Sequence, residues 1–159
     1  MKPLVNLDSL EDFDDHSHKS FQAKYSDIGA KIGAEKLGYN LTIVPPGKKS
    51  WPFHNHHISE EMFLVIEGTG LLRFGDDEYS VKKNDVIACP VGKRSVAHQF
   101  INNSTKDLKY LALGTKATQD ICEYPDSDKI LARSNKDGES LLWNMSKTEE
   151  SYDYFEDEE

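Results

Sequence analysis

Short runs of β-branched and aromatic residues, each closed by a turn signal, fill the middle of this 159-residue chain and constrain its fold more than any other feature. Such runs are typical of β-strands, and Pro45-Pro46-Gly47 and Gly68-Thr69-Gly70 are typical of the turns between them. No helical period interrupts the series, so we expect an all-β fold, an antiparallel jelly-roll β-barrel. The expected strands are 37–44, 51–57, 61–67, 71–74, 78–81, 85–89, 95–101 and 108–114, followed by trailing strands at 121–124, 130–132 and 141–143.

The length of the chain allows one hydrophobic core and is too short for two. We therefore predict a single β-barrel domain over residues 34–145, which includes the trailing strands. Residues 1–33 are polar, and we expect an extended N-terminal arm that drapes over the core. Residues 146–159 are an acidic tail, which we predict to be disordered.

Charge and apolar patterning exclude two classes of partner. The net charge is -9, and the last eleven residues hold seven acidic side chains without a lysine or arginine, so the remainder carries -2. An acidic chain without a basic stripe is not expected to bind nucleic acid or an anionic membrane. No apolar run is long enough to span a membrane or to act as a secretion signal, and Cys89 and Cys122 are far apart. We therefore expect a cytoplasmic location.

Three histidines and one glutamate have the spacing of a metal site. Side chains alternate in a strand, so His54 and His56 point the same way and His57 points the other way. Glu61 opens the next strand and His98 lies in a later one, so both join the pair if the sheet closes on itself. These imidazole and carboxylate ligands suit one divalent transition metal, namely Zn, Fe, Mn, Ni, Co or Cu. The alternative is a site without metal, in which the histidines hydrogen-bond a small-molecule ligand directly.

Aromatic residues flank these four donors. Phe63 and Phe100 lie two positions from the glutamate and the third histidine, so they should face the same interior and form the wall of a substrate pocket. Trp51 and Phe53 stand at odd-numbered positions, whereas His54 and His56 stand at even-numbered ones, so in a continuous strand the two pairs face opposite sides. We expect the side chains of Trp51 and Phe53 on the outer surface of the sheet or against another subunit.

Basic residues give the only indication of substrate charge. Lys48-Lys49 and Lys93-Arg94 each follow a glycine in the loop before a ligand strand. If both loops open on one rim, these four residues would bind a carboxylate or phosphate, and otherwise they are solvated turn residues. No general base, Ser/His/Asp arrangement or cysteine nucleophile is evident, so the catalytic residues stay unassigned. His16 and His18 lie in the acidic arm, and we assign them no role.

The motifs described above resemble those of the cupin family. Gly47, His54-x-His56, Glu61 and Gly68 are similar to the first cupin motif, and Pro90-x-Gly92 with His98-x-x-x-Asn102 is similar to the second. Gly47 stands one residue further from the first histidine than usual, and five residues rather than two separate Gly92 from His98. Asn84 occupies a turn position where the family has glycine, and asparagine tolerates the left-handed backbone that glycine supplies.

This resemblance covers about Lys36 to Gly114, roughly half of the chain. Gly114-Thr115-Lys116 and Tyr124-Pro125-Asp126 resemble a poorly characterised branch of single-domain cupins, some of which are labelled sugar-phosphate isomerases by similarity. The resemblance implies a homodimer formed through barrel edges. It leaves two functions open: a metal-dependent enzyme, with isomerisation of a sugar phosphate as the specific suggestion, or a non-catalytic module that binds a small ligand or a metal.

Overall fold

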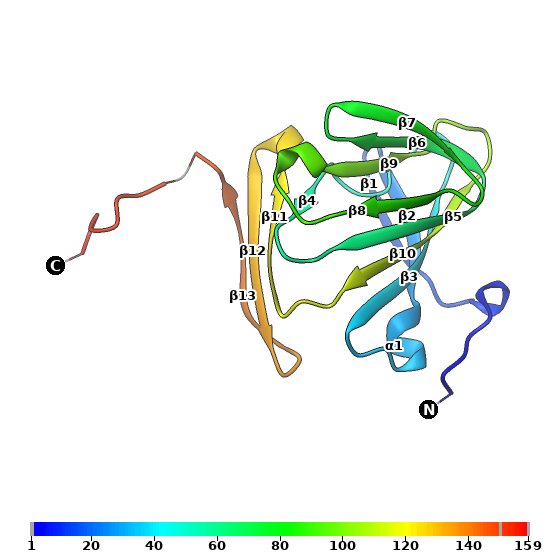
Figure 1. Ribbon diagram of the computed structural model, residues 1–159, viewed down its shortest axis with the longest axis horizontal. Helices are drawn as coiled ribbons and strands as arrows, with labels where there is room; N and C mark the ends of the chain where they lie inside the picture. The colour runs from blue at the N-terminus through cyan, green and yellow to red at the C-terminus, as the bar shows by residue number, and fades with distance from the viewer. Residues whose placement is uncertain (1, 150, 159) are drawn as a thin grey trace.

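The computed structural model describes residues 2–149 and 151–158, and strands dominate it (Figure 1). Its helical segments are α1 (Ile28–Ile32) and short 3-10 helices at Leu7–Ser9, Arg94–Val96 and Pro125–Ser127. The strands are β1 (Asp14–His18), β2 (Phe21–Asp27), β3 (Leu37–Val44), β4 (Asn55–His56), β5 (Glu61–Glu67), β6 (Thr69–Phe74), β7 (Asp77–Lys82), β8 (Val86–Cys89), β9 (His98–Ile101), β10 (Leu108–Thr115), β11 (Gln119–Tyr124), β12 (Lys129–Lys136) and β13 (Glu139–Lys147).

The strands form three sheets, and the predicted all-β jelly-roll class is confirmed. The sheets have the orders β1-β2-β3-β10-β5-β8, β13-β12-β11-β4 and β7-β6-β9. Strand β10 pairs antiparallel with both β3 and β5, so segments far apart in the sequence become neighbours. This pairing places the beginning of β5 beside the end of β10, where one of the candidate ligands lies.

Two of the expected strands are shorter than predicted. The segment 51–57 contributes only the two residues of β4, because Pro52 has no amide hydrogen for a ladder and the chain turns there. The segment 95–101 becomes a strand only at His98, since the preceding residues form a 3-10 turn. Asn84 has φ of 74°, which confirms the left-handed backbone expected at that turn.

The N-terminal segment takes part in the largest sheet. Strands β1 and β2 form a hairpin, and β2 pairs with β3. The ring of His16 in β1 lies 5.3 Å from that of Tyr25 and 5.4 Å from that of Trp51. His16 and His18 therefore belong to a paired strand, whereas the division of the chain into arm, domain and tail stays a prediction.

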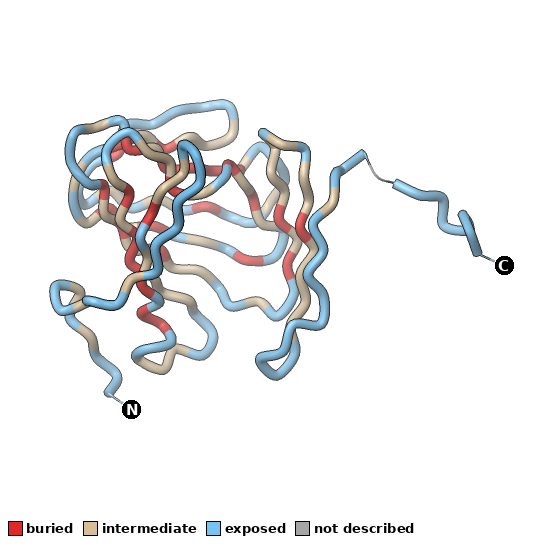
Figure 2. The backbone as a smooth tube through the Cα atoms, turned by 180° about the vertical axis from the view of Figure 1, so that it is seen from behind, coloured by how far each residue is buried: buried red, intermediate tan, exposed pale blue. Residues whose placement is uncertain are grey.

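Aromatic side chains fill the centre of the core, which Figure 2 shows as the buried segments inside the sheets. The rings of Phe100 and Tyr110 stack at 4.5 Å, and the ring of Phe63 meets that of Phe100 edge-on at 5.0 Å. All three residues are at most 5% exposed, so Phe63 and Phe100 face the interior as predicted. Cys89 is part of the same core, and burial raises the pKa of its thiol to about 12.

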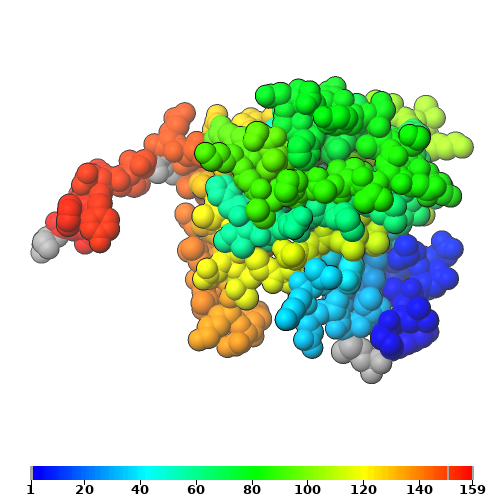
Figure 3. All heavy atoms as spheres, viewed as in Figure 1, coloured from blue at the N-terminus to red at the C-terminus, as the bar shows by residue number. Residues whose placement is uncertain are grey.

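The C-terminal hairpin of β12 and β13 lies at one side of the molecule, and residues 151–158 project beyond it (Figure 3). Strand β13 is an edge strand whose Leu141 and Trp143 are exposed. In the tail, Tyr152, Tyr154 and Phe155 are also exposed. Within the described residues, no helix is long and apolar enough to cross a membrane.

Candidate metal centre

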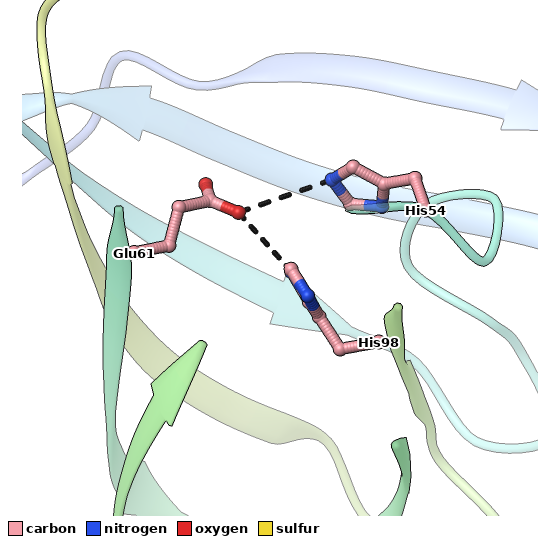
Figure 4. A group of neighbouring side chains, drawn as sticks. All are labelled: His54, Glu61 and His98. Carbon is pink, nitrogen blue, oxygen red and sulfur yellow. Dashed lines mark hydrogen bonds and ion pairs between the residues drawn. The ribbon is translucent and has the colours of Figure 1, made fainter. Parts of the chain in front are cut away.

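The four side chains predicted as metal ligands lie together, although their strands belong to three different sheets. Glu61 opens β5 of the largest sheet, His98 opens β9 of the smallest, and His56 ends β4 of the third. His54 stands just before β4 and exchanges both backbone hydrogen bonds with His98, at 3.2 and 2.8 Å. Figure 4 shows the side chains of His54, Glu61 and His98 pointing toward one another.

The carboxylate of Glu61 stands at the centre of the group. Its Oε2 atom lies 3.9 Å from Nε2 of His54, 3.3 Å from Nε2 of His56 and 3.1 Å from Nε2 of His98. The ring centroids of His54 and His56 are 5.1 Å apart, so these two side chains point the same way, as strand alternation predicts. One oxygen atom thus faces three imidazole nitrogens in a mostly buried setting.

Neighbouring polar residues lie outside this cluster. Nε2 of His57 is 2.6 Å from Oε1 of Glu123, and the ring is partly exposed. Glu60 is exposed, and its carbonyl oxygen accepts a hydrogen bond from the amide of Thr115. Glu61, rather than Glu60, is therefore the carboxylate that faces the histidines.

The hydrogen bonds of the remaining ring nitrogens decide which atoms face Glu61. Nδ1 of His54 lies 2.8 Å from the carbonyl oxygen of Pro52, which can only accept, so this nitrogen carries a proton. Nδ1 of His56 lies 2.8 Å from Oδ2 of Asp120. An ionised carboxylate also only accepts, so this nitrogen carries a proton as well. If both rings are neutral, their Nε2 lone pairs face an ionised carboxylate oxygen, which is repulsive without a cation between them. The donor set therefore fits a divalent metal.

Burial and mutual contact set the charges of the metal-free cluster. Burial, together with nearby His98, lowers the pKa of His54 to about 4, so this ring is neutral at pH 7. Burial also opposes the charged form of His56, but its contacts with Cys122 and Glu61 outweigh burial and raise its pKa to about 11. Burial disfavours the ionised form of Glu61 as well, yet hydrogen bonds with His56 and His98 hold its pKa far below the usual value. Without metal, a proton on His56 therefore supplies the cation.

Three residues of β11 contact the cluster, and sequence reasoning missed all of them. Asp120 and Cys122 approach Nδ1 of His56 to 2.8 and 3.2 Å, and these three side chains form a second close grouping. The ring of Tyr124 stacks on that of His54 at 6.1 Å, and burial raises the pKa of its phenol to about 12. Strand alternation places these three side chains on one face of β11, but their contact with His54 and His56 depends on the pairing of β11 with β4.

A small cavity of about 60 Å³ adjoins the cluster inside the fold. Phe63, Phe100 and Trp51 line it, and a role for the two phenylalanines in a substrate pocket stays a prediction. The expectation that Trp51 and Phe53 lie on the outer face is wrong. Phe53 is buried and Trp51 packs against the core, because the turn at Pro52 interrupts the alternation on which that expectation rested.

A larger cleft of about 520 Å³ lies between β1, the loop before β4 and the end of β11. Its walls include the aromatic rings of Trp51, Phe53 and Tyr124. Ser50 and Trp51 line both the cleft and the small cavity, so the two spaces share a wall. The cleft has the size of a small-molecule site, whereas the cavity has room for little more than a water molecule or two.

The four basic residues predicted to bind an anion line neither space. The guanidinium of Arg94 pairs with Glu123 at 3.0 Å and with Asp128 at 3.1 Å. Lys48 donates through Nζ to the carbonyl oxygen of Lys19 at 3.2 Å. The backbone of Lys49 bridges β2 and β9, and Lys93 is exposed. A role for these residues in anion binding stays a prediction.

The sheet architecture and the clustered histidines define a class of protein. Residues 40–114 match the cupin domain family, and this segment of the chain is a cupin domain. The matched range begins in β3 and ends in β10, so it contains all four candidate ligands but not β11.

Individual relatives extend this similarity to the whole chain. A crystal structure named "putative sugar phosphate isomerase" from Acidithiobacillus ferrooxidans is 26% identical, with a TM-score of 0.83 over 95% of this chain and 96% of that one. A cupin-superfamily sugar phosphate isomerase structure from Silicibacter pomeroyi shares the fold at 24% identity, with a TM-score of 0.79 over 94% and 95% of the two chains. An uncharacterised protein of Methanocaldococcus jannaschii is 34% identical over 83 residues, and this match spans only about half of each protein, 52% of this chain and 56% of the relative.

Proposed function

We propose that this protein is a metal-dependent enzyme acting on a small polar or anionic molecule, with one divalent transition metal bound by His54, His56, Glu61 and His98. The observation that carries the proposal is the convergence of three Nε2 atoms on one carboxylate oxygen, at 3.1 to 3.9 Å. When bound, such an ion polarises a carbonyl or hydroxyl group and lowers the pKa of a bound water molecule.

The remaining residues near the centre bind and orient the substrate. Because the inner cavity is too small for a sugar, the body of the substrate occupies the larger cleft and its reacting end reaches the metal. The aromatic faces of Trp51 and Tyr124 pack against a sugar ring there. Phe63 and Phe100 lie on the inner side of the ligands and exclude water from that side.

The specific reaction we propose is the isomerisation of a sugar phosphate. Its support is the name of the Acidithiobacillus relative, which matches nearly the whole chain. Binding of the phosphate by Lys48, Lys49, Lys93 and Arg94 is the prediction made from the sequence, and none of the four lines the cleft or the cavity. A homodimer in the cytoplasm is likewise a prediction that rests on the sequence and its resemblance.

One observation favours a second function, a non-catalytic module that binds a small ligand or a metal. Apart from the candidate ligands, the polar side chains that line the inner cavity are neutral: Asn40, Ser50, Gln99 and Tyr110. An isomerase needs a general base, and none of these four is one at neutral pH. An isomerase would therefore need its general base among the candidate ligands or in the larger cleft.

Metal analysis followed by a substrate screen tests the proposal. The purified protein should carry about one transition metal ion per chain, and His56→Ala should lose it while the outward-facing His57→Ala keeps it. The metal-loaded protein is then mixed with aldose and ketose phosphates, and interconversion is followed by NMR. Full metal occupancy in a His54→Ala, His56→Ala double variant would refute the metal centre. Tight binding of a sugar phosphate without turnover would favour the binding module.

A further inference from the structure

We propose that Asp120, which lies outside the segment matched to the cupin domain, is the positioning residue for His56 and fixes Nε2 of that ring as the atom that binds the metal. This inference rests on the proposed metal centre and adds a residue to it. Oδ2 of Asp120 accepts a hydrogen bond from Nδ1 of His56 at 2.8 Å, and the Nε2 atom on the opposite side of the ring faces Glu61 at 3.3 Å.

The carboxylate of Asp120 is itself firmly held. Its side chain is fully buried, and Oδ1 accepts hydrogen bonds from the backbone amides of Ile58 and Ile121 at 3.1 and 2.9 Å. On the Oδ2 side, Nη2 of Arg133 lies 3.4 Å away. A buried carboxylate with backbone donors and a nearby guanidinium is stable in its ionised form, so it acts as an acceptor and keeps the proton on Nδ1.

The contact has the form of the carboxylate–histidine pairs that orient metal ligands in other proteins, in which the second ring nitrogen donates to a fixed acceptor. His54 has the same arrangement with a different acceptor, the carbonyl oxygen of Pro52. Both members of the His-x-His pair are thus held through Nδ1. Only the acceptor of His56 is a side chain, so only this one can be changed by substitution.

A second metal site made of His56, Asp120 and Cys122 is a competing interpretation of the same geometry. The three donor atoms lie close enough to hold an ion. However, Arg133 already places a positive charge beside Asp120, and the grouping offers only three ligands, of which Asp120 and Cys122 are buried. Hydrogen bonding explains the 2.8 Å contact without a second ion. The two interpretations differ in stoichiometry, one Zn²⁺ per chain against two.

The same strand supplies a matched control. Glu123 contacts His57 as Asp120 contacts His56, through a short carboxylate–imidazole pair of 2.6 Å. His57 is the adjacent residue and points away from the cluster. Changing Glu123→Gln therefore removes the carboxylate that contacts His57, and His57 is not a proposed metal ligand.

The test measures the Zn²⁺ affinity of the full-length protein by competition with a chromophoric chelator. Asp120→Asn is nearly isosteric, but its amide group turned toward Nδ1 would favour a proton on Nε2, so the dissociation constant should rise about 10- to 100-fold. Glu123→Gln should leave it unchanged. In a His56→Ala background, whose residual Zn²⁺ binding is measured at higher Zn²⁺ concentrations, Asp120→Asn should have no further effect, because the proposed action passes through His56 alone.

Nitrogen-15 spectra of the histidine rings supply a readout that a purely structural role would not change. In the Zn²⁺-loaded wild type, Nδ1 of His56 should be protonated and Nε2 should be metal-bound, and this result decides the matter even if Asp120→Asn does not fold. Metal on Nδ1, two Zn²⁺ per chain, an unchanged affinity in Asp120→Asn or an added loss in the His56→Ala background would overturn the inference. A wild type that binds no Zn²⁺ would refute the metal centre and the inference together, so the two failures are distinguishable.

Discussion

Metal binding should release about one proton at pH 7, because His56 must give up its proton to the solvent before Nε2 can bind an ion. Its pKa is raised to about 11, so the metal-free ring is charged at pH 7, whereas His54, with a pKa of about 4, is already neutral. Glu61 is ionised over the same range, since its pKa is far below the usual value. Between the pKa of His54 and that of His56, only the proton on His56 competes with the metal.

The magnitude follows from linkage. A ligand that displaces one proton gains a factor of about 10 in affinity, or about 1.4 kcal/mol, for each unit of rising pH while the pH stays between roughly 5 and 9. Titration calorimetry with Zn²⁺ in buffers of different ionisation enthalpy measures the protons released, and chelator competition at several pH values measures the slope. Release near zero, with an affinity that does not change with pH, would show that His56 is neutral in the metal-free protein or is not a ligand.

Three further predictions concern the scaffold, the tail and the substrate. Gly68 has φ of 82°, and a Cβ there would overlap the carbonyl oxygen of Asp107, so Gly68→Ala should lower the free energy of unfolding by about 3 kcal/mol or more. Gly47→Ala, also at positive φ but with open space around it, should cost only about 1 to 2 kcal/mol, and equal melting temperatures of the two variants would contradict this. Deleting residues 149–159 should change the free energy of unfolding by less than about 1 kcal/mol, because Tyr152, Tyr154 and Phe155 are exposed; a large fall in melting temperature or loss of an oligomer would show that they dock. Replacing Lys93 and Arg94 together by Ala should weaken a sugar phosphate by about 1 to 3 kcal/mol with metal content intact, and calorimetry showing equal binding of phosphorylated and neutral sugars would dispose of the anion site.

Local patterns in the sequence were enough to predict the jelly-roll class and to select the four candidate metal ligands. Alternation in a strand requires only neighbouring residues, which is why the common direction of His54 and His56 and the interior position of Phe63 could be predicted. The same rule failed for Phe53, because a proline ended the strand that the rule assumes.

Asp120 illustrates what sequence reasoning could not reach. Its contact with His56 joins residues 64 positions apart and requires β11 to pair with β4, a strand of two residues. Nothing in Gln119-Asp120-Ile121 distinguishes this aspartate from a solvated one, since burial is decided by the strands that cover it. The N-terminal hairpin escaped prediction for a related reason: β1 is polar on both faces, so its sequence has no buried side to mark it as a strand.

The candidate ligands belong to three separate sheets, so an ion bound by all of them would act as a cross-link within the fold. Removing the ion would then allow β4, together with the hairpin of β11 and β12 in the same sheet, to shift relative to β5 and β9. Hydrogen exchange in β11 and β12 should slow when metal is added, although most of that hairpin does not touch the ion. Substitutions that disrupt the pairing of β12 with β13 would then alter metal affinity through the orientation of one sheet, far from either histidine motif.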